Sequence, residues 1–207
     1  MTERKSEEIQ MDKTLVLVRH GQTLFNMENR VQGWCDSPLT ETGRAQAALA
    51  GKTLQEAGYV FDHVYCSTAE RACDTAEIVG GMPYVRCKDL RERCYGRMEG
   101  ESRRISHCIP AEMRDAFYTA MGGESRAQVQ QRVYHQLEQI MQKEDHHTVL
   151  AVSHGESIAC MIEMVLKEQA DVFLKEHRIE NCSMTILLYS ERMFYLQKML
   201  YIPEAAS

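Results

Sequence analysis

The sequence predicts an α/β fold: a three-layer α/β/α domain with a mostly parallel central sheet and a helical insertion over the strand C-terminal ends. Three observations support this fold class. Short apolar, β-branched runs alternate with longer amphipathic segments, which is the pattern of parallel crossover units. The first of these runs, Leu15 to Val18, has the length and composition of a buried strand. Residues 88–124 interrupt the alternation, and two adjacent strands end the predicted sheet.

Helices are expected wherever apolar residues recur at helical spacing between these runs. The segment from Thr40 places Ala47 and Leu54 on one face, and Gly58 can stop the helix. Ser67 or Thr68 can cap a second helix. The predicted strands are residues 14–18, 62–66, 83–87, 148–152, 183–189 and 193–200, and the predicted helices are residues 40–58, 68–79, 125–142 and 155–167.

Residues 88–124 are expected to form short helices that lie over the strand ends as a lid or side wall. Six arginines and four glycines interrupt any regular pattern there. The whole chain, residues 1–207, is interpreted as one domain, because this length suffices for a single large core. Residues 1–11 are polar and are expected to form a loose tail.

The charge balance excludes several classes of partner. The chain has 24 basic and 30 acidic residues, a formal net charge of -6, which argues against a nucleic-acid surface. No run approaches the roughly 20 apolar residues of a membrane span, and the N-terminus lacks a secretory signal pattern. We therefore expect a cytoplasmic protein that binds neither nucleic acid nor a membrane. The composition fits a homodimer as well as a monomer.

The first strand ends in residues suited to chemistry. Arg19, His20 and Gly21 follow the apolar run directly, and ligands of open α/β sheets bind at the carboxyl ends of strands. We expect the glycine to let the backbone turn and approach a ligand. Taken alone, Arg19 and His20 could equally be ordinary polar residues at a strand exit.

A second strand ends in the same way, since His154 and Gly155 follow residues 148–152. A third ends near Ser67, with Arg71 in the next helical turn. In a parallel sheet these ends share one edge, so Arg19, His20, Arg71 and His154 should converge. Guanidinium groups match the oxygens of a phosphate. An imidazole whose other nitrogen is held by a backbone carbonyl is a nucleophile at neutral pH.

The motifs along the chain resemble those of the histidine phosphatase superfamily, whose fold is phosphoglycerate-mutase-like. The first is R-H-G-Q-T-x-x-N, which ends at Asn26. The others, in the family's order over nearly the whole chain, are Q-G-W-C-D-S-P-L-T (32–40), S-T-A-E-R-A-C-D-T-A (67–76), L-R-E (90–92), G-R-M-E-G (96–100), G-G-E-S (122–125), S-H-G (153–155) and N-C-S (181–183).

The resemblance implies a role for each matched residue. His20 would be the nucleophile that becomes phosphohistidine, with Arg19, Arg71 and His154 holding the phosphoryl group. Glu92 would be the general acid and then the base, although alone it could be a solvated partner of Arg91 or Arg93. The resemblance also implies a small phosphorylated metabolite as the partner. The implied substrate-binding residues are Thr23, Asn26, Gln32, Gly33, Arg93, Tyr95 and Gly155.

No metal or cofactor is expected in the reaction, because two arginines and His154 supply the charge that magnesium supplies elsewhere. His146-His147 is interpreted as a polar loop rather than a ligand pair, and His63 has no ligand spacing around it. None of the eight cysteines forms a C-x-x-C pair, so neither a zinc knuckle nor a thioredoxin-type site is indicated. Reduced thiols are expected because the N-terminus lacks an export signal and the chain is long enough for a sizeable core.

Two branches of the family compete. The motifs L-R-E, M-E-G, G-G-E-S and N-C-S resemble the small phosphatases, which favours metal-independent hydrolysis of small phosphomonoesters through a phosphohistidine on His20. Glu92 to Gly96 resembles the E-R-x-Y-G of the cofactor-dependent phosphoglycerate mutases, the second interpretation, although the long mutase-type insertion is not recognisable. An inactive binding or regulatory module is a third, but it predicts damage to the core residues, which are all present.

Overall fold

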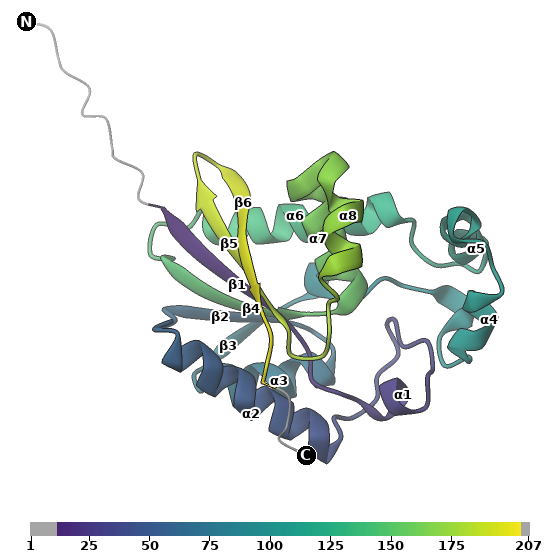
Figure 1. Ribbon diagram of the computed structural model, residues 1–207, viewed down its shortest axis with the longest axis horizontal. Helices are drawn as coiled ribbons and strands as arrows, with labels where there is room; N and C mark the ends of the chain where they lie inside the picture. The colour runs from purple at the N-terminus through teal and green to yellow at the C-terminus, as the bar shows by residue number, and fades with distance from the viewer. Residues whose placement is uncertain (1–11, 204–207) are drawn as a thin grey trace, which may run out of the picture.

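The computed structural model describes residues 12–203, in which a six-stranded sheet lies between two layers of helices (Figure 1). The strand order is β3-β2-β4-β1-β5-β6. The strands are β1 (Lys13–Arg19), β2 (His63–Ser67), β3 (Tyr84–Cys87), β4 (Thr148–Ser153), β5 (Met184–Ser190) and β6 (Met193–Leu200). Strands β1 to β4 are parallel, whereas β5 pairs antiparallel with both β1 and β6. The predicted mostly parallel α/β sheet is confirmed.

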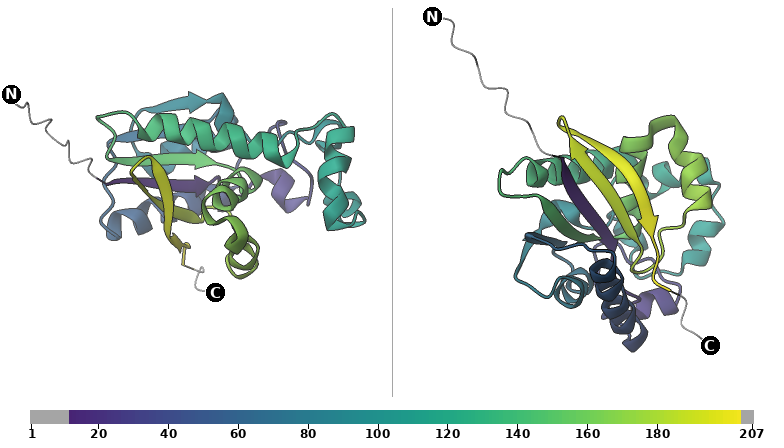
Figure 2. Two further views of the ribbon diagram at one scale, coloured as in Figure 1. Left: turned by 90° about the horizontal axis from the view of Figure 1, so that it is seen from above. Right: turned by 60° about the vertical axis from the view of Figure 1, so that its left-hand side comes forward.

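Each face of the sheet carries two long helices. Helices α2 (Glu41–Glu56) and α3 (Glu70–Gly80) cover one face, and α6 (Arg126–Met141) and α7 (Gly155–Leu166) cover the other (Figure 2). Strand β1 contributes side chains to the hydrophobic core on each face of the sheet, because successive side chains of a strand point to opposite faces. Leu15 and Leu17 pack on the α6 and α7 side, and Val16 and Val18 pack on the α2 and α3 side, all four fully buried.

The insertion consists of short helical segments at the carboxyl end of the sheet, as expected. Figure 2 (left) shows α4 and α5 grouped beyond the end of β4. Its segments are the 3₁₀ turns η1 (Lys88–Leu90), η2 (Gly96–Met98) and η3 (Ala111–Met113) and the helices α4 (Arg103–His107) and α5 (Arg114–Ala120). This placement makes residues 88–124 a wall beside the strand ends.

One expectation about a helix cap is wrong, and two connections contain helices that the sequence pattern does not predict. Ser67 and Thr68 do not cap α3: its N-cap is Ala69, without a side-chain hydrogen bond, because Ser67 is still the last residue of β2. The connection after the first strand contains a helical turn, α1 (Leu24–Met27), with a capping box formed by Thr23 and Asn26. The connection before β5 contains η4 (Lys167–Gln169) and α8 (Ala170–Glu176), whose Phe173 packs against the core.

The expected loose tail falls on residues 1–11, which lie outside the described part of the chain. Within residues 12–203, no helix combines the length and the apolar character that crossing a bilayer requires. All eight cysteines are free thiols.

Candidate active site

His20 and His154 face each other at the ends of two neighbouring strands. Arg19 of β1 pairs with Ser153 of β4, so the next residue on each strand lies at the same edge. The two imidazole rings are 5.2 Å apart between centroids and meet edge to face at 60°. Both side chains are buried. The convergence predicted from the two strand ends is therefore present in the structure.

The environment of His20 leaves one ring nitrogen available for attack. Nδ1 lies 2.8 Å from the carbonyl oxygen of Gly21, so the proton on Nδ1 is donated there and Nε2 carries the lone pair. Burial lowers the pKa of the imidazole well below its ordinary value of 6.5, and the guanidinium groups of Arg71 and Arg19 lower it further. The ring is therefore neutral at pH 7, as a nucleophile must be.

Gly21 has a packing role that differs from the expected one. A Cβ there would lie 2.4 Å from the carbonyl oxygen of Gly43, and a Cβ on Gly43 would lie 2.1 Å from the carbonyl oxygen of Gln22. The two glycines let the start of α2 contact the backbone that follows β1. The close approach is thus to a helix of the same chain, and it fixes the segment that carries His20.

Arg71 holds the loop that follows α1. Its Nη2 donates to the carbonyl of Gly33 at 2.8 Å, and its Nη1 donates to the carbonyl of Cys35 at 3.1 Å and to Oδ1 of Asp36 at 2.9 Å. Gly33 has a φ of +58°, and a Cβ there would meet Oε1 of Glu99 at 2.4 Å, so only glycine fits. The charge of Arg71 lowers the pKa of both His20 and His154, which places it beside them.

The side chain of Arg19, at the end of β1, lies next to Gly155. Its Nη1 donates to the carbonyl of Ile179 at 2.7 Å. A Cβ on Gly155 would lie 3.5 Å from Nε of Arg19, an ordinary contact, so glycine is not needed there for space. Burial lowers the pKa of Arg19, and the carboxylate of Glu92 opposes that shift, so these two charges are neighbours.

Several buried donors at this edge lack a partner. They are Nε of Arg19, Nε of Arg71, Nε2 of Gln32 and Nδ1 of His154, none of which has a hydrogen-bond partner within residues 12–203. Buried polar groups are nearly always paired, so unpaired donors of this kind suit an anion with several acceptor oxygens. A phosphoryl group has this character.

Thr23, Asn26 and Gln32 form a small network beside His20. The hydroxyl of Thr23 donates to Oε1 of Gln32 at 3.1 Å, and the N–H of Thr23 donates to Oδ1 of Asn26 at 3.2 Å. Asn181 joins this network to the nucleophile, since its Nδ2 donates to the carbonyl of His20 at 2.9 Å and to Asn26 at 3.2 Å. Sequence reasoning assigned no role to Asn181, although it opens the quoted N-C-S motif.

Glu92 sits at the N-terminus of α7. Its Oε1 accepts from the backbone N–H of Arg93 at 2.9 Å and of Ser157 at 3.1 Å, and its Oε2 accepts from the N–H of Glu156 at 3.2 Å. Two of these N–H groups belong to the first turn of α7, so the start of the helix fixes the position of the Glu92 carboxyl group. Because α7 begins directly after His154, this arrangement brings Glu92 to the same edge as both histidines.

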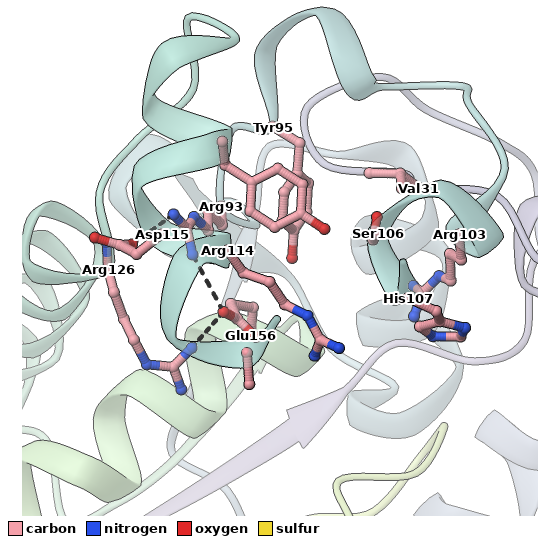
Figure 3. A pocket seen from close by; sticks show the side chains of 12 residues that line it. Val31, Arg93, Tyr95, Arg103, Ser106, His107, Arg114, Asp115, Arg126 and Glu156 are labelled. Carbon is pink, nitrogen blue, oxygen red and sulfur yellow. Dashed lines mark hydrogen bonds and ion pairs between the residues drawn. The ribbon is translucent and has the colours of Figure 1, made fainter. Parts of the chain in front are cut away.

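A cleft of about 350 Å³ opens beside this edge, between the insertion and α7 (Figure 3). Arg93 and Tyr95 line it, but the guanidinium of Arg93 is buried and occupied by Glu124, Asp115 and Glu156. Arg103 lies across the cleft, and its charge contributes to the lowered pKa of His20. The acidic residues Asp115 and Glu156 also line the cleft. The remaining lining residues are Val31, Ser106, His107, Ala111, Arg114, Tyr118 and Arg126.

Of the residues expected from the sequence, His20, Arg19, Arg71, His154 and Glu92 occupy one edge of the sheet. The loop residues Thr23, Asn26, Gln32 and Gly33 lie next to them through hydrogen bonds. Arg93 and Tyr95 lie in the wall instead, with Arg93 paired inside the protein. Their contacts with a substrate stay predictions.

Known proteins are similar to this chain in sequence and in structure. The family model of the histidine phosphatase superfamily (branch 1) matches residues 15–201. A 2,3-bisphosphoglycerate-dependent phosphoglycerate mutase of Brucella canis is 33% identical, in an alignment covering 77% of this chain and 88% of the relative. Bacillus stearothermophilus YhfR superposes with a TM-score of 0.79 at 33% identity, covering 89% of this chain and 95% of that one.

A mycobacterial glucosyl-3-phosphoglycerate phosphatase, in its complex with VO3, superposes with a TM-score of 0.75 at 30% identity and covers 89% of this chain and 97% of its own. The similar proteins thus include a mutase and a phosphatase. What they share is the fold and the superfamily. This chain belongs to the histidine phosphatase superfamily, branch 1.

Proposed function

We propose that this protein is a phosphatase that hydrolyses small phosphomonoesters through a phosphohistidine intermediate on His20. The observation that carries the proposal is the state of His20: a buried, neutral imidazole with Nδ1 bound to the Gly21 carbonyl and Nε2 free. Arg19, Arg71 and His154, each with a buried donor that lacks a partner within residues 12–203, lie near this imidazole. The cleft volume of about 350 Å³ is in the range of small-molecule sites.

In the first step, Nε2 of His20 attacks phosphorus, and the bond from phosphorus to the ester oxygen breaks as the new P–N bond forms. Arg19, Arg71 and His154 donate to the three equatorial oxygens, where the charge of the transition state is concentrated. Glu92 gives its proton to the departing alcohol oxygen. Its Oε2 is suited to this transfer, because this oxygen accepts a single backbone hydrogen bond of 3.2 Å.

In the second step, water attacks the phosphohistidine. Glu92, now ionised, accepts a proton from this water, the P–N bond breaks, and inorganic phosphate leaves with His20 neutral again. Glu92 therefore acts as acid and then as base, and it starts the next cycle protonated. The protein groups supply the positive charge for both steps, so we propose that the reaction needs no metal ion.

Phosphoglycerate mutase activity is the second candidate. Arg93 and Tyr95 of the E-R-C-Y-G segment line the cleft, and the relative from Brucella canis is named as a mutase. A mutase returns the phosphoryl group to a bound phosphoglycerate instead of to water, so it must hold that intermediate and exclude water. Arg103, Arg114 and His107 offer additional cationic or polar contacts in the cleft for a second anionic group.

A phosphate-release assay in EDTA separates these activities. The substrates would be p-nitrophenyl phosphate, phosphoserine, sugar phosphates and 3-phosphoglycerate, and formation of 2-phosphoglycerate would be followed with and without 2,3-bisphosphoglycerate. We expect phosphate release from at least one ester and its loss in His20→Ala. The matched control is His135→Ala, an exposed histidine on α6 outside the site, which should keep full activity.

Three other results would contradict this proposal. Isomerisation that depends on the bisphosphate, with little free phosphate, would establish the mutase. Release that survives in His20→Ala would exclude the phosphohistidine route. No turnover of any ester by folded protein would favour the binding module.

A further inference from the structure

A second group of imidazoles lies at the opposite end of the sheet from His20. His63 is the first residue of β2, and the last residue of the same strand, Ser67, contacts His154. His146 lies just before β4, and Asp145 precedes it. We call His63, Asp145 and His146 the distal cluster. Four residues of extended strand separate it from the catalytic edge by about 13 Å.

The three side chains of the distal cluster point their polar atoms at one another. Nε2 of His63 lies 3.4 Å from Oδ2 of Asp145, and Nδ1 of His146 lies 2.7 Å from Oδ1 of the same carboxylate. The two imidazole rings stack at 3.7 Å between centroids. The three candidate ligand atoms all lie within 4.8 Å of one another. Two imidazoles and one carboxylate that converge on one position form a ligand set that transition metals bind.

The other nitrogen of each imidazole is already held by a polar group. Nδ1 of His63 lies 3.0 Å from Oδ1 of Asp62, whose Oδ2 accepts two backbone N–H bonds of 2.7 Å each. Nε2 of His146 lies 2.7 Å from the hydroxyl of Tyr65, which also accepts from Nζ of Lys143 at 2.8 Å. Such outer contacts orient metal-binding histidines and set which nitrogen faces the ion.

We propose that the distal cluster binds one divalent transition-metal ion of the zinc type, through Nε2 of His63, Nδ1 of His146 and the carboxylate of Asp145. Zinc bond lengths near 2.0–2.1 Å place tetrahedral ligands about 3.3 Å apart. The pair His63–Asp145 already has this spacing at 3.4 Å, whereas the hydrogen-bonded pair His146–Asp145 must open from 2.7 Å. Hard cations such as magnesium prefer all-oxygen sites, so the two imidazoles select against them. Asp145 and His63 are partly exposed, which leaves the fourth position to water.

Ion binding requires two small changes. A metal ion lies in the plane of each imidazole that ligates it, so the rings must open from their interplanar angle of 13°. His63 can make this movement because a third of its side chain is exposed. His146 must also carry its proton on Nε2, which faces the Tyr65 hydroxyl, so that Nδ1 can turn from Asp145 to the ion.

The proposed ion has a structural role that is separate from the reaction at His20. It would join the start of β2 to the loop before β4, and so it would stabilise the folded chain against unfolding. The sequence gives no sign of this site, because His63 and His146 come from distant segments that only the sheet brings together. Failure of this proposal would leave the proposed phosphatase activity untouched.

The test is metal binding by the full-length protein after treatment with a chelator and dialysis. Isothermal titration with Zn²⁺, and absorption titration with Co²⁺ to report on tetrahedral coordination, would give affinity and stoichiometry. We expect one ion per chain, a rise in melting temperature with Zn²⁺, and an affinity lowered at least about tenfold in His63→Gln and Asp145→Asn. Both replaced side chains are partly exposed, so the variants should fold.

The control is His147→Gln, which removes the next imidazole along the chain and should bind as the wild type does. Equal Zn²⁺ affinity in the wild type, His63→Gln and Asp145→Asn would overturn the proposal, because the ion would then be held elsewhere, for example by cysteine thiols. Wild-type protein that binds neither Zn²⁺ nor Co²⁺ would overturn it as well.

Discussion

Nε2 of His154 lies 2.7 Å from the hydroxyl oxygen of Ser67, a contact that joins the ends of β4 and β2 beside the nucleophile. The N–H of Ala69 donates to the same hydroxyl at 3.2 Å, so the serine proton is free to point at His154. With the serine proton donated to Nε2, His154 carries its own proton on Nδ1, a buried atom that has no hydrogen-bond partner within residues 12–203. Ser67 thus prepares His154 to donate to a phosphoryl oxygen.

Replacing Ser67 with alanine should therefore lower kcat by roughly tenfold while KM changes little, because a positioning hydrogen bond of this kind is worth about 1–3 kcal/mol. Steady-state kinetics on the best ester would measure the split between kcat and KM. Thr68→Ala, one residue further along, is the matched control and should behave as the wild type. Equal kcat in Ser67→Ala and Thr68→Ala would show that the hydroxyl does not prepare His154.

The role of Glu92 predicts a dependence on the leaving group. In Glu92→Gln, alkyl phosphates should lose about 10²–10⁴-fold in kcat/KM, because their alcohol leaves poorly without a proton donor. An aryl ester such as p-nitrophenyl phosphate should still phosphorylate His20, so stopped-flow kinetics should show a burst of nitrophenol followed by slow turnover. The exposed Glu101→Gln is the control. A uniform loss on both kinds of ester would argue against acid catalysis by Glu92.

The two site histidines should make stability depend on pH. Burial lowers the pKa of His20 and of His154 well below 6.5, and the charge of Arg71 lowers both further. Above pH 6.5 neither histidine makes the free energy of unfolding depend on pH, since both are neutral whether the chain is folded or unfolded. As the pH falls below 6.5 the unfolded chain binds these protons first, so the free energy of unfolding decreases.

Urea unfolding between about pH 7 and pH 5 would measure this effect, which is at most about 1.4 kcal/mol per pH unit for each histidine. His20→Gln and His154→Gln should each lose less stability over the range than the wild type does. Identical pH slopes for the variants and the wild type would mean that neither imidazole is kept neutral by folding.

The glycine pair predicts a steric effect on stability. Gly43→Ala would place a methyl group 2.1 Å from the carbonyl oxygen of Gln22, so the start of α2 must move away from the segment behind His20. We expect a loss of about 1–3 kcal/mol and reduced activity. Gly51→Ala, in the same helix, meets its nearest atom at 3.2 Å and should be close to neutral. Comparable melting temperatures for the two variants would refute the interpretation.

The strands and long helices could be predicted from sequence because burial on two faces leaves a strong pattern. Strand β1 is a continuous apolar run, and α2 carries Ala47 and Leu54 at helical spacing. Helix α1 could not be predicted, since four residues leave no periodicity and a capping box holds it. Helix α8 could not be predicted because its seven residues are too few to show a helical period, although four of them, Ala170, Val172, Phe173 and Leu174, are apolar.

The site residues that end strands could also be predicted, because parallel strands bring their carboxyl ends to one edge. The contacts that hold these site residues in place could not be predicted. Asn181 binds the His20 carbonyl, and Gly43 packs on Gly21, across long sequence separations that no local pattern reveals. The sequence pattern correctly places Ser67 near the carboxyl edge of the sheet. It wrongly predicts a capping role, because a serine just before a helical segment is typical of an N-cap.

The most direct measurement is to trap the phosphorylated enzyme. Protein mixed with a good ester would be quenched within milliseconds at alkaline pH, where phosphohistidine survives, and mapped by mass spectrometry. We expect one phosphoryl group per chain on the imidazole of His20, with none in His20→Ala and more in Glu92→Gln, which hydrolyses the intermediate slowly. Phosphate on another residue, or full turnover with no phosphoenzyme at any time, would show that His20 is not the nucleophile.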